Sequence, residues 1–108
     1  FKKRINKMYE VAYKDYIFIC PKCTQDIKDE AVMQNNCVAS YIDKVINGEC
    51  QILFLRKKSN PKQSLITIEV RDNRIVQALR RFNNPVTDED QEAINYFNRK
   101  FEKEKMAA

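Results

Sequence analysis

Four cysteines are the side chains in this 108-residue sequence with the clearest potential for chemistry. Two residues lie between Cys20 and Cys23, whereas Cys37 and Cys50 stand alone, and there is no histidine. A structural zinc site usually takes its ligands from two tight pairs. The pattern therefore predicts free thiols, with zinc at Cys20 and Cys23 as the weaker alternative, and we expect no cofactor.

Cys37 is the candidate nucleophile. It precedes a helix expected between Asn36 and Gly48, and the positive end of a helix dipole favours a thiolate. Ser40 and Tyr41 follow within one turn. A nucleophilic cysteine normally works with a base, and histidine is missing. The alternative is a small, buried, chemically inert thiol.

Glu69 and Arg71 form a Glu-x-Arg pair on an expected strand. This pair is similar to the Glu-x-Lys of restriction-endonuclease-like nucleases, in which carboxylates hold Mg²⁺. Such a site needs a second acidic ligand at a strand end, and neither Asp43 nor Glu49 is well placed. The alternative is a cross-strand charge pair between Glu69 and a basic residue, Arg74 or Lys58.

The basic residues point to a different function. Twenty Lys and Arg against fifteen Asp and Glu give a net charge of +5, which favours an anionic partner such as nucleic acid. Basic groups beside an aromatic ring can hold phosphates while the ring stacks on a base. Alternatively, lysines at hairpin tips only keep a sheet edge soluble. The candidates are Arg56, Lys57, Lys58, Arg71, Arg74, Arg80, Arg81 and Phe82.

Both helices and strands are expected to position these residues. We expect an α+β domain of order α-β-α-α-β-β-β-α, in which helices pack on a small antiparallel sheet made of a three-stranded meander and a short N-terminal strand. Apolar spacing predicts helices over 2–12, 25–33, 38–47 and 88–102, and strands over 16–20, 50–55, 65–71 and 74–79.

Local signals refine these elements. Asn36 is placed to cap the second long helix and Gly48 to end it. Thr87 and Asp90 have the spacing of a capping box for the last helix. The apolar stripe around Ile42 and the stripe on the last helix are both expected to pack on one face of the sheet. Asp72-Asn73 can supply the positive-φ pair of a hairpin turn.

Segments 34–56, 65–78 and 82–85 together resemble PcfJ-like proteins, a family tied to conjugative plasmids and related mobile elements. The resemblance rests on Cys-Val-x-Ser-Tyr, Thr-x-Glu and Ile-Val-Gln elements and an Asn-rich loop. Many members carry histidine just before the cysteine, where this chain has Asn35 and Asn36. If the domain is an enzyme, hydrolase or nuclease-like, the polar positions that match the family pattern imply its site: Cys37, Ser40, Tyr41, Glu69 and Gln77.

We expect one PcfJ-like domain over residues 1–108, excised from a longer bacterial protein because it begins with Phe, and a frayed tail over 103–108. No apolar run reaches the ~18 residues of a membrane span, so we expect a cytoplasmic protein without a membrane partner. The predicted function is a non-catalytic nucleic-acid-binding or assembly module. The alternatives are the enzyme above and a protein-interaction module in a transfer or defence complex.

Overall fold

A five-stranded antiparallel sheet forms the centre of the fold. The computed structural model describes residues 1–107, and for Lys2 and residues 103–107 it describes the backbone alone. The strands lie side by side in the order in which they occur along the chain. The strands are β1 (Ala12–Tyr13), β2 (Tyr16–Ile19), β3 (Gln51–Lys57), β4 (Ile66–Arg71) and β5 (Arg74–Arg80).

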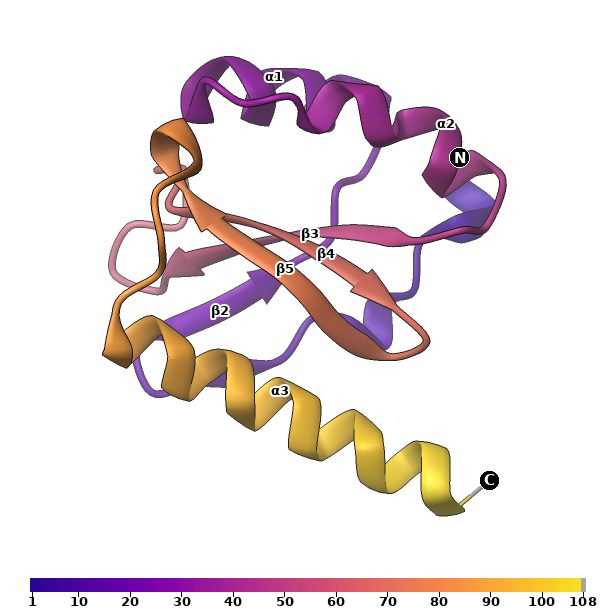
Figure 1. The fold of residues 1–108 in the computed structure, drawn as a ribbon, viewed down its shortest axis with the longest axis vertical. Coiled ribbons are helices and arrows are strands. Elements are labelled where there is room, and N and C mark those ends of the chain that lie inside the picture. Colours follow the sequence, from indigo (N-terminus) through magenta and orange to yellow (C-terminus); the bar gives the residue numbers. More distant parts are fainter. Residues whose placement is uncertain (108) are drawn as a thin grey trace.

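Helices cover both faces of this sheet, which confirms the α+β class. α1 and α2 lie over one face and α3 over the other (Figure 1). None of the described helices is long and apolar enough to cross a membrane. The helices are α1 (Thr24–Gln34), α2 (Ile42–Ile46) and α3 (Asp88–Ala107), and the 3-10 turns are η1 (Lys2–Arg4), η2 (Lys7–Tyr9), η3 (Val38–Tyr41) and η4 (Arg81–Asn83).

The N-terminal helix expected over 2–12 is wrong. Asn6 adopts an extended conformation and its side chain accepts a hydrogen bond from the Met8 N–H, so a new turn begins there instead of one helix continuing. The chain then forms β1, which pairs with β2 and makes a fifth strand. The turn between β1 and β2 has Lys14 at φ 52°.

The helix expected between Asn36 and Gly48 exists but is broken. It consists of the 3-10 turn η3 and the five-residue α2, and Tyr41 at the junction has φ −87° and ψ −6°. The cap is confirmed, because the Asn36 Oδ1 accepts a hydrogen bond from the Val38 N–H at 3.0 Å. Gly48 ends the segment at φ +79°, as expected. Ile46, at the end of the predicted stripe, is exposed.

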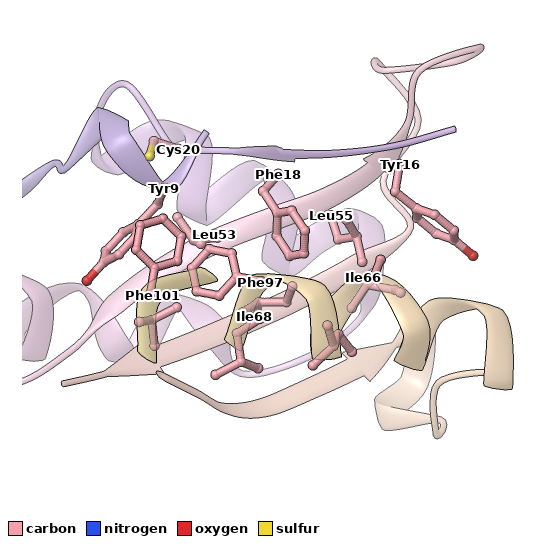
Figure 2. Close-up of a cluster of buried hydrophobic side chains, with 14 residues drawn as sticks. Tyr9, Tyr16, Phe18, Cys20, Leu53, Leu55, Ile66, Ile68, Phe97 and Phe101 are labelled. Atoms are coloured by element: carbon pink, nitrogen blue, oxygen red, sulfur yellow. The ribbon is translucent and has the colours of Figure 1, made fainter. Parts of the chain in front are cut away.

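Each face of the sheet has its own apolar core. Phe18, Phe97 and Phe101 are fully buried between α3 and the sheet (Figure 2). Val45 and the partly buried Ile42 belong to the core beneath α1 and α2. The stripe around Ile42 and the stripe around Phe97 therefore pack on opposite faces, which corrects the expectation of a shared face. The segment after η4 carries the chain across the end of the sheet to the far side (Figure 1).

The β4–β5 hairpin contains an irregularity that matters for the site. Its turn is as expected, with Asp72 at φ 51° and Asn73 at φ 64°. Val70 pairs with Ile75, but its neighbour Glu69 pairs with Gln77, so β5 has one extra residue between the two partners. Ile75 consequently joins the core on the α3 side, and Gln77 lies on the opposite face with Glu69.

Candidate functional site

Three central strands align polar side chains on the face beneath α1 and η3. In the strand register, Glu69 of β4 lies between Ile52 of β3 and Gln77 of β5. Two residues earlier on β4, Thr67 pairs with Leu79 of β5 and forms a second row on the same face. Directly opposed side chains on one face of an antiparallel pair have Cβ atoms about 4.5–5.5 Å apart. Glu69 and Gln77 therefore present a carboxylate and an amide side by side.

These rows form the floor of a pocket of about 390 Å³ that η3 and the loop before it close from above. Small-molecule sites in proteins typically measure about 300–1,000 Å³. Val38, Ile52, Ile68 and the polar residues Thr67 and Glu69 are buried, whereas Cys37, Gln77 and Asn83 are exposed. The lining residues are Asn36, Cys37, Val38, Tyr41, Ile52, Thr67, Ile68, Glu69, Gln77, Leu79 and Asn83.

Four of the five enzyme candidates meet in this pocket. Cys37, Tyr41, Glu69 and Gln77 come from three separate segments, and all four line it. Ser40 does not line it, and its Oγ donates a hydrogen bond to the Cys37 carbonyl oxygen at 2.7 Å. The structure brings the four groups together, whereas their chemical role stays a prediction.

Sequence reasoning missed three polar members of the wall: Asn36, Thr67 and Asn83. Asn36 was expected only as a helix cap, and Thr67 only as part of the Thr-x-Glu element. Asn83 reaches the pocket because two consecutive residues, Phe82 (φ 59°) and Asn83 (φ 60°), adopt the left-handed conformation. The Asn-rich composition of this loop was the available signal, since asparagine tolerates that conformation.

Glu69 is buried, and its charge is neutralised within its own strand. The Arg71 Nε donates to the Glu69 Oε2 at 2.6 Å, and this hydrogen bond, helped by the carboxylate charge, raises the pKa of Arg71. The expected cross-strand partners, Arg74 and Lys58, are therefore wrong. Residues two apart on a strand share a face, which explains the pairing. Among the described residues, the Oε1 of Glu69 has no hydrogen-bond partner, so it remains an acceptor at the pocket wall.

Two features of the enzymatic hypothesis lose support. Asp43 and Glu49 do not line the pocket, and the described residues contain no group of three or more acidic or thiol side chains placed for a metal. Cys37 is exposed and precedes a four-residue 3-10 turn instead of a long helix. The dipole argument for a thiolate therefore has no physical basis here, because the summed dipole requires aligned peptides over several turns.

A buried polar network fixes the wall on the α1 side. Glu30 is fully buried and accepts hydrogen bonds from the Arg56 Nη2 at 2.9 Å and the Thr67 Oγ1 at 3.2 Å. Burial raises the pKa of Glu30, and the interactions with Arg56 and Thr67 oppose that rise. Thr67 in turn accepts from the Asn36 Nδ2 at 3.3 Å. The network therefore ties α1, β3 and β4 to the loop that carries Cys37.

Most of the basic residues expected to contact phosphates are paired within the chain. Besides Arg56 and Arg71, Arg80 binds the buried Asp90 at 2.7 Å and Lys57 lies 3.3 Å from Glu89. The basic residues also do not form one patch. The register pairs Arg71 with Arg74 at one end of the sheet and Ile66 with Arg80 at the other. No intrachain ion pair involves Lys58, Arg74 or Arg81 among the described residues.

Two aromatic rings near the pocket each have a cationic side chain over the ring. The Lys44 Nζ lies 4.6 Å from the centre of the Tyr41 ring, and the Arg81 Cζ lies 4.9 Å from the centre of the Phe82 ring. Phe82 is 56% exposed, which is unusual for phenylalanine. Figure 1 shows η4, which contains Phe82, at one end of the helical layer and α2 at the other. One pair is therefore in the pocket wall at Tyr41, and the other is adjacent in sequence to the wall residue Asn83.

Zinc binding by Cys20 and Cys23 can be tested directly. Cys20 is in the core on the α3 side, where burial raises the pKa of its thiol to about 12, whereas Cys50 is in the core on the opposite face. These two thiols cannot share one ion. We expect metal analysis of the purified protein to find well under one zinc per chain, and a chelator to leave the melting temperature unchanged. Stoichiometric zinc would contradict this expectation and indicate ligands from a second chain.

Comparisons with known proteins identify one family and one similar protein. The model of the family described as "PcfJ-like protein" matches residues 1–95. An uncharacterized protein of Listeria innocua, Lin1253/Lin1744, is 33% identical over 99 residues, which cover 88% of this chain and 22% of that protein. The chain thus spans about a fifth of the length of the curated relative it matches. No solved structure gives a significant match.

Proposed function

The chain belongs to the PcfJ-like protein family, and we propose that it serves as a module that binds single-stranded nucleic acid across the pocket face. The observation that carries this proposal is a pocket with both polar and apolar side chains that has one aromatic–cation pair in its wall, at Tyr41, and a second beside its wall residue Asn83, at Phe82. Proteins that bind single strands combine such stacking platforms with positive groups that follow the backbone. The net charge of +5 and the mobile-element setting implied by the family resemblance support the same partner.

The proposed contacts differ from those expected from sequence alone. Phe82 supplies a stacking surface, and Arg81 and Lys44 supply phosphate contacts beside the two rings. Arg56 and Arg80 instead hold buried carboxylates, so their loss would disturb the fold and not a phosphate contact alone. The binding surface is therefore the pocket and these two aromatic–cation pairs, not the ends of the sheet.

Binding can be measured with fluorescently labelled single strands of about 10 nucleotides, within the ~4–16 nucleotides that small single-strand modules cover. We expect Phe82→Ala to weaken binding by about 1–3 kcal/mol, since this is the usual value of one stacked base. Arg81→Ala should weaken binding to unrelated sequences alike and lower the slope of log affinity against log salt by about 0.7. A duplex of the same sequence should bind more weakly.

Arg74→Ala is the matched control for the cation. It removes the same charge as Arg81→Ala, but from the hairpin turn at the other end of the sheet. Val32→Ala is the control for the aromatic ring, because Val32 is a highly exposed apolar residue on the outer side of α1. Equal effects of Arg81→Ala and Arg74→Ala would mean that binding depends on net charge alone. Absence of binding to any DNA or RNA strand at low salt would refute the proposal and favour a protein partner.

An enzyme remains the second candidate function, because Cys37, Tyr41, Glu69 and Gln77 line one pocket. A substitution of Cys37 distinguishes the two functions. Cys37→Ser keeps the shape of the side chain and removes the nucleophilic thiol, so strand binding should persist. An activity that Cys37→Ser abolishes while strand binding is unchanged would establish the enzymatic function beside the binding one.

A further inference from the structure

We propose that the pocket accepts one unpaired nucleobase and reads its Watson–Crick edge with Glu69 and Gln77. This inference rests on the proposed function and specifies what enters the pocket. It depends on the juxtaposition of an available carboxylate oxygen and an available amide, which the register of β4 and β5 places on directly opposed positions.

The two groups offer complementary hydrogen bonding. The Oε1 of Glu69 can accept an N–H, and the Nε2 of Gln77 can donate to a ring nitrogen or carbonyl oxygen. Neighbouring donor and acceptor atoms are what the Watson–Crick edge of a base presents: N3–H beside O4 in uracil and thymine, the exocyclic amine beside a ring nitrogen in cytosine and adenine, and N1–H beside O6 in guanine. The geometry therefore suits a base edge without selecting one base.

The charge state of the pocket favours a neutral ligand over a cation. An isolated buried carboxylate would attract a positively charged group, but Arg71 lies 2.6 Å from Glu69 and compensates its charge. The compensated carboxylate still accepts hydrogen bonds, because each of its oxygen atoms has two lone pairs. A nucleobase is neutral and has several N–H and acceptor atoms in one plane.

The remaining wall suits the flat faces of a base. Val38, Ile52 and Leu79 are apolar and line the pocket together with Glu69 and Gln77. Their side chains come from η3, β3 and β5, so they approach from different directions. Pockets that hold an extruded base combine apolar walls with hydrogen bonds to its pairing edge. Since base pairing occupies that edge in a duplex, such a pocket requires an unpaired nucleotide.

Methylation of one edge at a time tests this inference. Three labelled RNA strands of about 10 nucleotides are compared: oligouridine, the same strand methylated at N3 of every base, and the same strand methylated at C5. Both methylated strands keep the phosphates and the stacking rings, but only N3 methylation blocks the Watson–Crick edge. We expect N3 methylation to weaken binding by roughly tenfold or more, as the loss of a two-bond base contact does. C5 methylation should change affinity by less than about twofold, because the methyl group lies on another edge.

Gln77→Met tests whether the difference in affinity between the N3-methylated and C5-methylated strands arises in the pocket. Methionine has a similar length but no amide, and the Gln77 side chain makes no hydrogen bond among the described residues and is exposed, so the fold should be unaffected. The variant should bind unmodified oligouridine more weakly, and N3 methylation should then weaken its binding much less than in the parent protein. Gln91→Met, on the exposed side of α3, is the matched control and should keep the full difference.

The outcomes distinguish this inference from the function on which it rests. If the parent protein binds N3-methylated and C5-methylated strands equally well, base reading is refuted while strand binding stands. If Gln77→Met keeps the full difference, the base is read elsewhere and the pocket assignment is wrong. If no strand binds, the proposed function fails, and the inference fails with it.

Discussion

Replacing Asp90 with alanine is expected to lower the free energy of unfolding by about 3–5 kcal/mol, the usual cost of removing one partner from a buried ion pair. Asp90 is fully buried and accepts hydrogen bonds from the Tyr16 hydroxyl at 2.6 Å and from the Arg80 Nε and Nη2 at 2.7 and 3.0 Å. It also forms the reciprocal capping box with Thr87. One carboxylate therefore joins β2, β5 and the start of α3, and urea denaturation measures its contribution.

Asp88→Ala is the matched control, because Asp88 lies in the same first helical turn but is exposed. Its loss removes only a favourable contact with the helix dipole, worth less than about 1 kcal/mol. Equal destabilisation by Asp88→Ala and Asp90→Ala would contradict the role assigned to the buried pair.

The same carboxylate makes stability depend on pH. Burial by itself would raise the pKa of Asp90, but hydrogen bonds from Arg80, Tyr16 and Thr87 outweigh it and lower the pKa to about 2, from an ordinary 3.8. The unfolded chain therefore binds the proton more readily than the folded one. The stabilisation is complete above about pH 4 and is lost as the pH falls from there toward 2, amounting to about 2 kcal/mol. In Asp90→Ala, the free energy of unfolding should therefore decrease less steeply than in the parent protein as the pH falls from about 4 toward 2.

Phe97→Ala is expected to lower the free energy of unfolding by about 3–5 kcal/mol, because it creates a cavity in the core on the α3 side. The Phe97 ring is fully buried, with its centre 4.9 Å from that of Phe18, 4.5 Å from that of Phe101 and 5.5 Å from that of Tyr9 (Figure 2). Removing it leaves a cavity that three rings cannot fill without leaving their own contacts. Denaturant titration should show a lower midpoint with a similar slope.

Phe82→Ala provides the comparison for this core variant. It removes the same side chain from an exposed position, so it should change stability by less than about 1 kcal/mol. A small effect of Phe97→Ala, comparable to that of Phe82→Ala, would show that α3 does not pack as described. The pair of variants also separates folding from binding, since only Phe82 belongs to the proposed strand-binding surface.

Local patterns predicted the elements whose causes are local. The alternation of Ile66, Ile68 and Val70 gave one apolar face for β4, and Asp72-Asn73 gave the hairpin turn. The capping box at Thr87 formed as its spacing indicated. Each signal involves residues within a few positions of one another, so neither packing nor topology could overrule it.

Other features were hidden by a competing local hydrogen bond or by contacts between distant segments. Spacing alone did not show that Asn6 would interrupt the first helix, because Ile5, Met8, Tyr9 and Ala12 also fit a continuous stripe. The partners of the arginines were equally hidden, since Arg56 reaches Glu30 on α1. Resemblance pointed to Cys37, Tyr41, Glu69 and Gln77, but only the sheet register together with the position of η3 shows that they meet in one pocket.

The extra residue in β5 makes one position of this hairpin tolerant of deletion, whereas the regularly paired positions beyond it are sensitive to insertions and deletions. Side chains on a strand alternate between faces with a period of two, so a change of one residue exchanges the faces of everything beyond it. A relative that lost the position of Val76 would keep the turn, the strand and nearly the same composition. It would also keep the position of Ile75 in the core on the α3 side and that of Gln77 in the pocket, because removing the extra residue restores the regular alternation. A gap at the position of Ala78, in the regular part of β5, would instead exchange the faces of the residues on one side of it, and would therefore separate members that share the fold from members that share the site.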